Sequence, residues 1–566
     1  MVEKVEHSFR AKTGRMGLRV FRNAFDGVRA HDSAITRHRR EGSWRAGSLL
    51  TDLWKWRDQT PSAPAIVAYR SGERVQLSYA EFAEWVERFA AGLAELGVGP
   101  GTVIAIQLPN WWEANALVLA AIRVGAVVAP LVPTLGEREQ ERILRRIGAA
   151  VCVTPEEWNG TDYASRMAGL AARLPQLKQR MIFGRARRPG EISFADHFVH
   201  SDWRPRQATT LAAIDVDPDR AAVVLFTSGT TGNPQGAVHS LNTLYALGAD
   251  FVRVWGHGCA DRYFTPHWSL HLAGMVCGIV YPLLVGGCCV MIDAWTPETA
   301  PAMLAAEEIT YLGGAPVFLT ALMTELHWQE RAIPSVRIVF AFGTTVPPQL
   351  VTKVADTFGV ALGAAWGMTE AGYIFTRPSD PADWAAHSVG RPSLGTEIQL
   401  RATEPITETQ PGRLMIRGAG VCVAILDRDE GGITLTRARS DGWYDTGDLA
   451  IPDGRGGIRL MGRAADRIGG VLMVPATDVE AALRDHPAVA DVALVGVPDP
   501  DGTEQVCAVI VPTGESPRLG ELRDFLTGVG MTEWYLPTRS VTRTELPYNA
   551  MGKVNKVLLK KQLTAP

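Results

Sequence analysis

The sequence predicts an α/β fold: a large N-terminal domain of stacked βαβ sheets with a small β-rich subdomain, followed by a small α+β C-terminal domain. Three observations support this. Short apolar runs alternate with amphipathic helical runs through residues 78–154, and again from the strand at residues 223–226 to about residue 375, as in mostly parallel sheets. Short strands between Gly and Pro turns fill residues 390–460. The composition then changes near residues 463–468, where we expect a domain boundary.

The first βαβ units follow from the spacing of apolar residues. Ser78 and Glu81 have the spacing of a capping box, and the Ala/Leu/Glu-rich helix that they begin ends at Gly97. Strands and helices then alternate at residues 102–108 (strand), 112–123 (helix), 126–131 (strand), 137–146 (helix) and 149–154 (strand). Residues 155–215 are polar and Arg-rich, so we expect them to form a surface excursion.

The C-terminal part is predicted to be compact. Its expected elements are a helix near residues 478–484, strands at 489–497 and 505–512, and a helix near 519–526. Residues 275–292 are the most apolar stretch of the chain, but they contain Pro282 and the pair Gly286-Gly287 and lack charged flanks. They therefore predict a buried helix, a turn and a buried strand rather than a membrane span.

Composition limits the function. The chain is 46% hydrophobic and 21% charged with a net charge of −3, which indicates a globular protein without general affinity for nucleic acid or membrane surfaces. Seven cysteines without a C-x-x-C pair predict reduced thiols and a cytoplasmic location. The first 45 residues are basic and lack the apolar core of a signal peptide. We expect a solvated or loosely docked arm there, with a partner-binding tail as the alternative.

A loop rich in hydroxyls and glycine follows the strand at residues 223–226. Residues 227–232, Thr-Ser-Gly-Thr-Thr-Gly, place four hydroxyls and several backbone amides in one turn, and Gly229 and Gly232 permit positive φ angles. Many neutral donors in a short loop suit phosphate oxygens. The stretch lacks the G-x-x-x-x-G-K-[ST] pattern of a Walker A loop. It predicts phosphate binding, and an ordinary Ser/Thr/Gly-rich turn is the alternative.

Five motifs, in chain order, give the sequence a resemblance to a known family. They are TSGTTGNPQG at 227–236, AWGMTEAG at 365–372, DGWYDTGDLA at 441–450, GRAADRI at 462–468 and LPYNAMGKVNK at 546–556. Together they resemble the adenylate-forming superfamily of acyl-CoA synthetases and other AMP-binding enzymes over roughly residues 50–560. The pattern is most similar to medium-chain and cyclohexanecarboxylate-type CoA ligases, and Trp366, where most members have Tyr, fits that branch.

The resemblance implies an ATP- and Mg²⁺-dependent reaction. A carboxylate oxygen attacks the α-phosphate of ATP, pyrophosphate leaves, and an acyl-AMP remains; positioning and charge neutralisation do most of the catalytic work. Lys553, Glu370 and Thr369 match the family's catalytic positions, and Glu370 and Thr227 are the expected metal ligands. The expected nucleotide contacts are Thr227, Ser228, Gly229, Thr230, Thr231, Gly232, Gly343, Thr344, Trp366, Gly367, Asp448 and Arg463. The expected acid pocket contains Trp268, His271, Thr345 and Ala364.

The implied roles suit the chemistry of these side chains. The face of Trp366 suits adenine, and the carboxylate of Asp448 can accept hydrogen bonds from two ribose hydroxyls. A flexible ammonium at Lys553 can offset charge that develops at the α-phosphate. Other readings are a surface charge at Glu370 or Arg463, a turn residue at Asp448, a satisfied core histidine at His271, and an ordinary lysine at Lys553.

The sequence departs from the family pattern at three places. Gln235 stands where the family usually has Lys, which removes a charge from the pyrophosphate side. Ala465 occupies the hinge position, which is usually Asp or Lys. The loop after Ile468 is shortened and apolar, although in the family it helps to form the pantetheine tunnel. The resulting expected organisation is a basic arm (1–45), an adenylation domain (46–462), a hinge (463–466) and a mobile C-terminal domain carrying Lys553 (467–566).

Three functions remain open. The first is an acid–CoA ligase that activates a carboxylic acid and transfers it to CoA. The second is an adenylating enzyme with another acceptor, such as a carrier protein or an amine, or an ATP-dependent diazotase that activates nitrite for attack by an aryl amine in secondary metabolism. The third is a non-catalytic nucleotide-binding relative, which the joint presence of Glu370, Asp448, Arg463 and Lys553 disfavours. ATP and Mg²⁺ are expected in the first two, and the diverged loop weakens the case for CoA.

Overall fold

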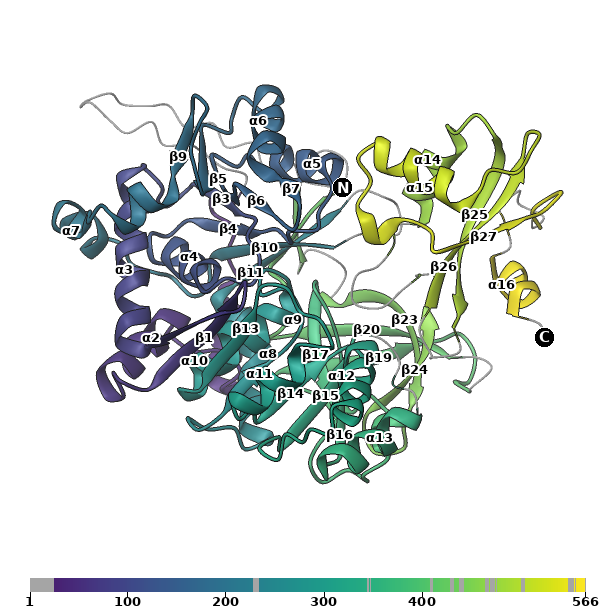
Figure 1. The fold of residues 1–566 in the computed structure, drawn as a ribbon. Coiled ribbons are helices and arrows are strands. Elements are labelled where there is room, and N and C mark those ends of the chain that lie inside the picture. The colour runs from purple at the N-terminus through teal and green to yellow at the C-terminus, as the bar shows by residue number, and fades with distance from the viewer. Residues whose placement is uncertain are drawn as a thin grey trace.

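The structure is a computed structural model that confirms the expected α/β architecture (Figure 1). It describes residues 25–227, 234–343, 346, 348–407, 411–427, 432–436, 442–463, 468, 474, 476–499, 504–547, 554 and 556–564. Two nine-stranded sheets form the N-terminal domain, a four-stranded sheet forms the β-rich subdomain, and a three-stranded sheet forms the centre of the C-terminal domain. In Figure 1 the C-terminal domain, in yellow, lies beside the N-terminal domain and follows β24 in the chain.

The first nine-stranded sheet has the order β18-β17-β16-β15-β14-β12-β13-β1-β2. Its inner strands from β16 to β1 pair in parallel, and antiparallel strands close both edges. Its strands are β1 (Pro64–Arg70), β2 (Glu73–Ser78), β12 (Arg262–Phe264), β13 (Cys288–Ile292), β14 (Tyr311–Gly314), β15 (Ile338–Phe342), β16 (Leu362–Met368), β17 (Ala371–Phe375) and β18 (Arg391–Pro392).

The second nine-stranded sheet has the order β22-β21-β11-β10-β4-β3-β5-β8-β9. Its strands are β3 (Val103–Ile106), β4 (Val127–Pro130), β5 (Val151–Pro155), β8 (Gln179–Phe183), β9 (Glu191–Ser193), β10 (Ala221–Thr227), β11 (Gln235–Ser240), β21 (Ala424–Leu426) and β22 (Ile433–Leu435). The expected strands at residues 102–108, 126–131 and 149–154 are therefore confirmed.

Helices lie between the two sheets and on their outer faces. The buried cluster between the sheets joins residues of both sheets with helices α3 (Tyr79–Glu95), α4 (Trp112–Arg123) and α8 (Leu241–Val254). Outside the first sheet lie α11 (Ala300–Ala306), α12 (Pro316–Trp328) and α13 (Pro348–Phe358), and outside the second lie α5 (Glu137–Ile147) and α6 (Tyr163–Arg173). Because α4 is buried on nearly all sides, its sequence has no polar face.

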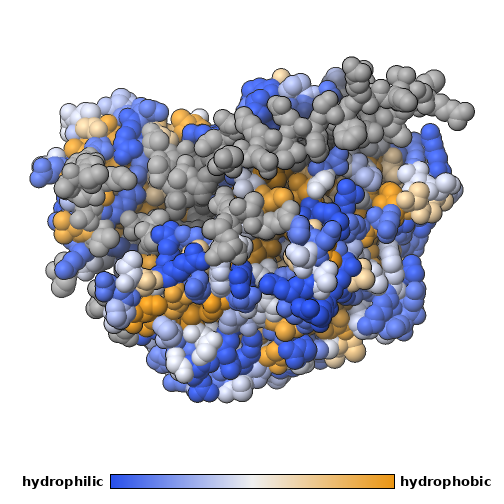
Figure 2. All heavy atoms as spheres, turned by 180° about the vertical axis from the view of Figure 1, so that it is seen from behind, coloured by the Kyte–Doolittle hydropathy of each residue, from blue (hydrophilic) through white to orange (hydrophobic). Residues whose placement is uncertain are grey.

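Residues 272–292 form short helical turns and then a strand, as expected from their sequence. They comprise α9 (Leu272–Met275), the π-helical turn η2 (Val276–Val280), α10 (Tyr281–Val285) and β13. Helix α10 ends at Gly286, which adopts a left-handed φ of 77°. In the part of the chain that the structure describes, no helix is both long and apolar enough to cross a membrane. The face shown in Figure 2 mixes hydrophilic and hydrophobic residues.

The β-rich subdomain and the C-terminal domain also agree with the prediction. Strands β19 (Thr396–Arg401), β20 (Gly412–Gly418), β23 (Tyr444–Pro452) and β24 (Ile458–Arg463) form the subdomain sheet. The C-terminal elements are α14 (Ala476–Arg484), β25 (Val489–Pro498), β26 (Glu504–Pro512), α15 (Leu519–Gly528), the 3₁₀ turn η6 (Glu533–Tyr535), β27 (Arg539–Thr542) and α16 (Lys556–Thr564).

Two expectations about surface segments are wrong. Residues 155–215 are not a simple surface excursion, because β8 and β9 extend the second sheet and Phe194 and Phe198 are buried in the central cluster. The segment also contains the hairpin β6 (Glu157–Trp158) and β7 (Thr161–Asp162), the π-helical turn η1 (Ala195–Val199) and α7 (Arg204–Ala212).

The N-terminal segment is more firmly packed than a loosely docked arm. From residue 25 onward it forms α1 (Asp32–Glu41) and leads into α2 (Leu49–Gln59). Trp44 lies in a small apolar cluster, and its indole Nε1 donates a 2.9 Å hydrogen bond to the carbonyl oxygen of Ala419. Arg39 donates a hydrogen bond to the carboxylate of Asp219, at a distance of 2.5 Å. The segment thus packs against both the β-rich subdomain and the chain that leads into β10.

Candidate active site

A largely apolar cavity of about 210 Å³ lies where β10, β15 and β16 end. The side chains that line it come from both nine-stranded sheets, from the π-helical region after β12 and from the C-terminal domain. They include Pro130, Leu131, Val132, Leu135, Leu225, Phe226, Leu247, Leu270, Leu272, Val276, Cys277, Tyr281, Phe342, Met368, Tyr373, Trp534 and Tyr535. Thr227, His271, Gly343, Gly367, Thr369 and Glu370, all expected in the site, line the same cavity.

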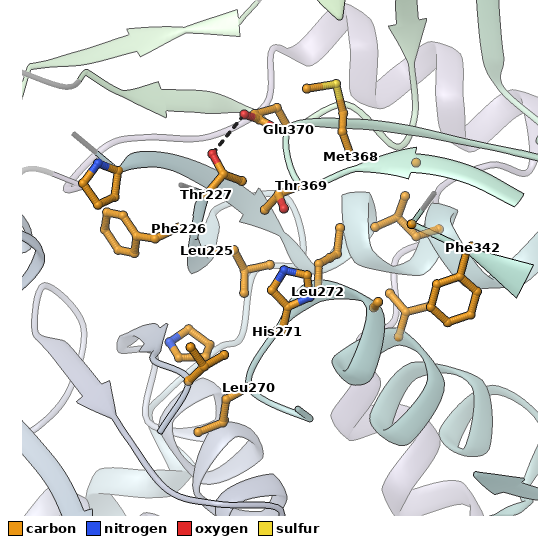
Figure 3. Close-up of a pocket in the computed structure, with 18 of the residues that line it drawn as sticks. Leu225, Phe226, Thr227, Leu270, His271, Leu272, Phe342, Met368, Thr369 and Glu370 are labelled. Carbon is orange, nitrogen blue, oxygen red and sulfur yellow. Dashed lines mark hydrogen bonds between the residues drawn. The ribbon is translucent and has the colours of Figure 1, made fainter. Parts of the chain in front are cut away.

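Two expected metal ligands meet at one edge of this cavity. Thr227 is the last residue of β10, and Glu370 lies in the tight turn between β16 and β17. The Thr227 hydroxyl donates a 3.3 Å hydrogen bond to Oε1 of Glu370, across 143 residues of sequence (Figure 3). The side chain of Glu370 is only 3% exposed, so its carboxylate is not an ordinary surface acid.

A buried histidine supports this turn, although its sequence context gave no sign of a role. His239 lies on β11 with Nε2 2.7 Å from the carbonyl oxygen of Thr369 and Nδ1 3.0 Å from the Thr243 hydroxyl. Because a carbonyl only accepts, Nε2 carries the hydrogen. Burial lowers the pKa of His239 to about 4, so the ring is neutral at pH 7. It therefore fixes the backbone of the Thr369–Glu370 turn without adding charge to it.

Trp366 and Asp448, the expected adenine and ribose contacts, are hydrogen-bonded to each other. The indole Nε1 of Trp366 on β16 donates to Oδ2 of Asp448 on β23 at 3.0 Å. Arg463 is the backbone partner of Asp448 in the antiparallel pair of β23 and β24, and nothing is described of its side chain. The structure therefore brings three positions from three different motifs together, although Trp366 and Asp448 do not line the cavity itself.

The expected acid-pocket residues lie in different surroundings. His271 lines the cavity, and its Nδ1 has no hydrogen-bond partner among the described residues (Figure 3). Burial lowers its pKa to about 4, which makes it a neutral side chain. Trp268 instead packs edge-on against Trp158 at 5.7 Å, and Ala364 is fully buried in the cluster on the other side of the first sheet. Neither Trp268 nor Ala364 lines this cavity.

Several expected site residues lie outside the described part of the chain. They are Ser228, Gly229, Thr230, Thr231, Gly232, Thr344, Thr345 and Lys553, together with the hinge residue Ala465. Gln235 is described, and its backbone pairs with Thr227 at the start of β11. The roles assigned to all of these residues stay predictions.

The C-terminal domain contributes two aromatic residues that were not among the site residues predicted from the sequence. Trp534 and Tyr535, on η6, line the cavity, and Thr532 just before them contacts helix α5. The Thr532 hydroxyl donates to Oε2 of Glu139 at 2.9 Å and accepts from the backbone N–H of Gly136 at 3.0 Å. A Cβ at Gly136 would lie 2.6 Å from the carbonyl oxygen of Gly530, so the close approach requires glycine.

Comparison with known proteins agrees with this geometry. A family model described as AMP-binding enzyme matches residues 53–424, and one described as AMP-binding enzyme C-terminal domain matches residues 478–553. The medium-chain fatty-acid–CoA ligase of Escherichia coli (strain K12) is 28% identical over 535 residues, which are 93% of this chain and 92% of that protein. A feruloyl-CoA synthase of Amycolatopsis sp is 31% identical over 509 residues, covering 87% of this chain and 95% of the synthase. The structure of the amide bond synthetase McbA from Marinactinospora thermotolerans superposes with a TM-score of 0.76 at 26% identity, covering 92% of this chain and 100% of that one.

Proposed function

Because this chain belongs to the family of AMP-binding enzymes, we propose that its cavity binds a hydrophobic carboxylic acid and presents the carboxylate to ATP at the Thr227–Glu370 edge. Membership of the family makes the protein an ATP-dependent, AMP-forming ligase. One carboxylate oxygen forms a bond to the α-phosphorus, the bond to pyrophosphate breaks, and an acyl-AMP results. The observation that carries the proposal is the meeting of Thr227, Thr369 and Glu370 at one edge of a largely apolar cavity.

The orientation of the acid follows from the charges around it. No Lys or Arg belongs to the described residues that line the cavity, and His271 is neutral because burial lowers its pKa to about 4. A carboxylate deep in the cavity would lack a cationic partner, and burying an unpaired charge is costly. The carboxylate should therefore face the polar edge, with the apolar body of the acid against Leu225, Leu272 and Phe342 (Figure 3).

Thr227 and Glu370 would hold Mg²⁺. The ion prefers oxygen ligands and usually takes one or two from the protein, with phosphate oxygens and water completing the shell. The observed pair offers this chemistry, and no group of three or more His, Cys, Asp or Glu that could hold a metal occurs among the described residues. When bound, the ion would neutralise charge on the phosphates.

The nucleotide would lie between the remaining motif residues. Trp366 and Asp448 are already joined by a hydrogen bond, which suits contacts to an adenine and to its ribose. We assign Arg463 to the ribose as well, and Gly343, Thr344, Gly367 and the loop 228–232 to the nucleotide and its phosphates. Lys553 would supply the cation at the α-phosphate. These assignments, and the boundaries 46–462, 463–466 and 467–566, are proposals that rest on the motif positions.

CoA is the first acceptor to test, since the two relatives above are a medium-chain fatty-acid–CoA ligase and a feruloyl-CoA synthase. A second candidate is an amine. It is supported by the similarity to an amide bond synthetase and by Trp534 and Tyr535, which give the cavity an aromatic wall from the C-terminal domain. An aryl amine that attacks activated nitrite, as in an ATP-dependent diazotase, belongs to this second class.

The seven free cysteines support the further proposal that the enzyme acts in the cytoplasm.

One experiment separates these functions. The protein is incubated with ATP, Mg²⁺ and a panel of hydrophobic acids or nitrite, and release of pyrophosphate and AMP is followed before and after addition of CoA or an aryl amine. Acid-dependent pyrophosphate release with thioester formation supports the first candidate. Acid-dependent release with amide formation, or nitrite-dependent release with consumption of the amine, supports the second. ATP binding without pyrophosphate release for any oxyanion would overturn both.

A further inference from the structure

Two tyrosine hydroxyls form a polar group at the otherwise apolar wall of the cavity. Tyr281, at the start of α10, and Tyr373, on β17, both line the cavity. The Tyr281 hydroxyl donates a 3.1 Å hydrogen bond to the Tyr373 hydroxyl. The ring of Tyr281 stacks on Phe251 with centroids 4.8 Å apart and planes 16° from parallel, so the donor is held in a fixed position.

The pair and its surroundings are uncharged. Burial raises the pKa of both tyrosines well above the ordinary value. Cys277, which also lines the cavity, lies with its sulfur 3.7 Å from the Tyr311 hydroxyl, and burial raises the pKa of its thiol to about 12. At pH 7 this part of the wall therefore offers only neutral donors and acceptors. Among the described residues that line this part of the wall, a charged substituent would find no counter-ion. A neutral polar substituent would find hydrogen-bond partners.

The hydrogen-bond capacity of the pair is not exhausted. Tyr281 uses its single proton on Tyr373, which leaves the proton of the Tyr373 hydroxyl without a partner among the described residues. The side chain of Tyr373 is partly exposed, and it lines the cavity. Once a bound acid excludes water from this wall, a hydroxyl proton without an acceptor costs free energy, so an acceptor supplied by the substrate would be favoured over a hydrocarbon.

We propose that Tyr373 and Tyr281 select an acid that carries a hydroxyl group on the part of the molecule away from its carboxylate. A hydroxyl can accept the free proton of Tyr373 and donate its own to a tyrosine oxygen, whereas the corresponding hydrocarbon acid leaves the Tyr373 proton unpaired. This inference rests on the proposed function, because it assumes that the cavity holds the acid. The carboxylate faces the Thr227–Glu370 edge, where the proposed Mg²⁺ and ATP would lie, and the hydroxyl faces the tyrosine pair.

The test compares pairs of acids that differ only by one hydroxyl. Acid-dependent exchange of pyrophosphate into ATP is measured for hydroxylated and plain benzoic, cinnamic and octanoic acids. We expect kcat/KM of the wild type to favour the hydroxylated member of at least one pair about tenfold or more. Tyr373→Phe should reduce that preference to within about twofold of unity, and Tyr281→Phe, a second variant in case the first does not fold, should reduce it in part.

A matched control removes another buried hydroxyl from the same aromatic region. Tyr263 does not line the cavity, and its hydroxyl lies 3.0 Å from Nδ1 of His257. Tyr263→Phe should keep the wild-type preference. Exchange with plain and hydroxylated acids at equal efficiency in the wild type, or an unchanged preference in Tyr373→Phe, would overturn this inference and leave the proposed function intact. No exchange with either member of any pair would overturn the proposed function, and the inference with it.

Discussion

Glu370 combines a buried position with a hydroxyl partner from a distant segment. Its carboxylate accepts the hydrogen bond of Thr227, and the backbone beside it is held by the neutral ring of His239. If a cation and a phosphate bind here as proposed, a carboxylate that is already fixed needs little reorganisation, and such preorganisation is where electrostatic catalysis gains most. The value of this residue should therefore lie in its charge rather than in its packing.

We predict that Glu370→Gln lowers acid-dependent pyrophosphate exchange about 100-fold. Glutamine keeps the shape and an acceptor oxygen for Thr227, but it removes the negative charge that would hold Mg²⁺. The Mg²⁺ concentration needed for half-maximal exchange should rise. Initial rates across a Mg²⁺ titration, with ATP binding measured separately, test the prediction.

The exposed acid Glu298 gives the matched control for this charge change. Glu298→Gln should leave both the exchange rate and the Mg²⁺ requirement within about twofold of the wild type, because surface substitutions away from such sites have small effects. A wild-type rate in Glu370→Gln at every Mg²⁺ concentration would remove Glu370 from the metal site.

The sequence predicted the motif residues of the site better than their neighbours. Thr227, Thr369 and Glu370 were expected together because each lies in a short pattern with its own chemistry, and the structure brings these three together. His239 and Tyr373 were missed. Each is a single polar residue in an apolar strand, and its role depends on contacts with residues far away in sequence, which local patterns do not reveal.

At the scale of elements, the contact between η6 and α5 places two aromatic residues of the C-terminal domain at the cavity. Thr532 is buried and makes two hydrogen bonds to the start of α5, one of them to the buried carboxylate of Glu139. Because both partners would lose a hydrogen bond in a buried interface, the contact is sensitive to a single substitution. We proposed above that Trp534 and Tyr535 face the acceptor. The contact between η6 and α5 should therefore matter most for the step that uses the acceptor.

We predict that Thr532→Val slows transfer to the acceptor at least about fivefold and changes pyrophosphate exchange by less than about twofold. Valine keeps the shape of threonine but removes the hydroxyl that bonds to Glu139 and to the N–H of Gly136, which costs roughly 1–3 kcal/mol. Both half-reactions are measured on the same preparation, exchange without acceptor and product formation from accumulated acyl-AMP.

Thr527, on the exposed face of α15 in the same domain, supplies the control. Thr527→Val should leave both half-reactions unchanged. If Thr532→Val slowed exchange as strongly as transfer, the η6–α5 contact would serve the whole site, and its assignment to the acceptor step would be wrong.

Most elements of the large domain were predictable because strand and helix periods differ clearly there. Helix α4 spans residues 112–123, as the alternation of strands and helices in this region led us to expect. Strand β8 was missed because only Met181 and Ile182 of its five residues are buried, and Gln and Arg residues precede them. An edge region of a sheet with few inward-facing apolar residues resembles a polar loop in sequence.

At the scale of the whole molecule, residues 25–48 connect parts of the fold that are far apart in sequence. Trp44 packs with Ala30, Ile35, Ala246 and Ala419, which places this segment against α8 and the β-rich subdomain. The segment contains many arginines and few apolar residues, so its composition suggested a solvated arm. Composition gave no weight to the few apolar residues that anchor it. The packing of Trp44 shows that a basic segment can be anchored by one large side chain.

We predict that Trp44→Ala lowers the free energy of unfolding by about 3 kcal/mol, since it removes a buried aromatic side chain and leaves a cavity. Trp44 is 5% exposed, whereas Trp328, at 76% exposed, provides a matched control. Trp328→Ala should change the free energy of unfolding by less than about 0.5 kcal/mol. Urea unfolding followed by circular dichroism measures both variants, and equal effects of the two would show that the N-terminal segment does not stabilise the fold.

Buried neutral histidines make the large domain sensitive to acid, and His239 is the one that supports the site. Burial lowers its pKa to about 4, below the ordinary value of about 6.5, so between pH 6.5 and pH 4 the unfolded chain binds a proton that the folded chain does not. Stability therefore falls as the pH falls through this range, by about 2 kcal/mol from this residue between pH 7 and pH 5.

His239→Gln keeps an N–H donor for the carbonyl of Thr369 but cannot titrate, so the loss of stability from pH 7 to pH 5 should shrink by about that amount. Urea titrations of the wild type and the variant at both pH values measure this loss. An equal loss in His239→Gln and the wild type would mean that His239 takes up its proton in the folded protein, and a charged ring would then lie against the Thr369–Glu370 turn.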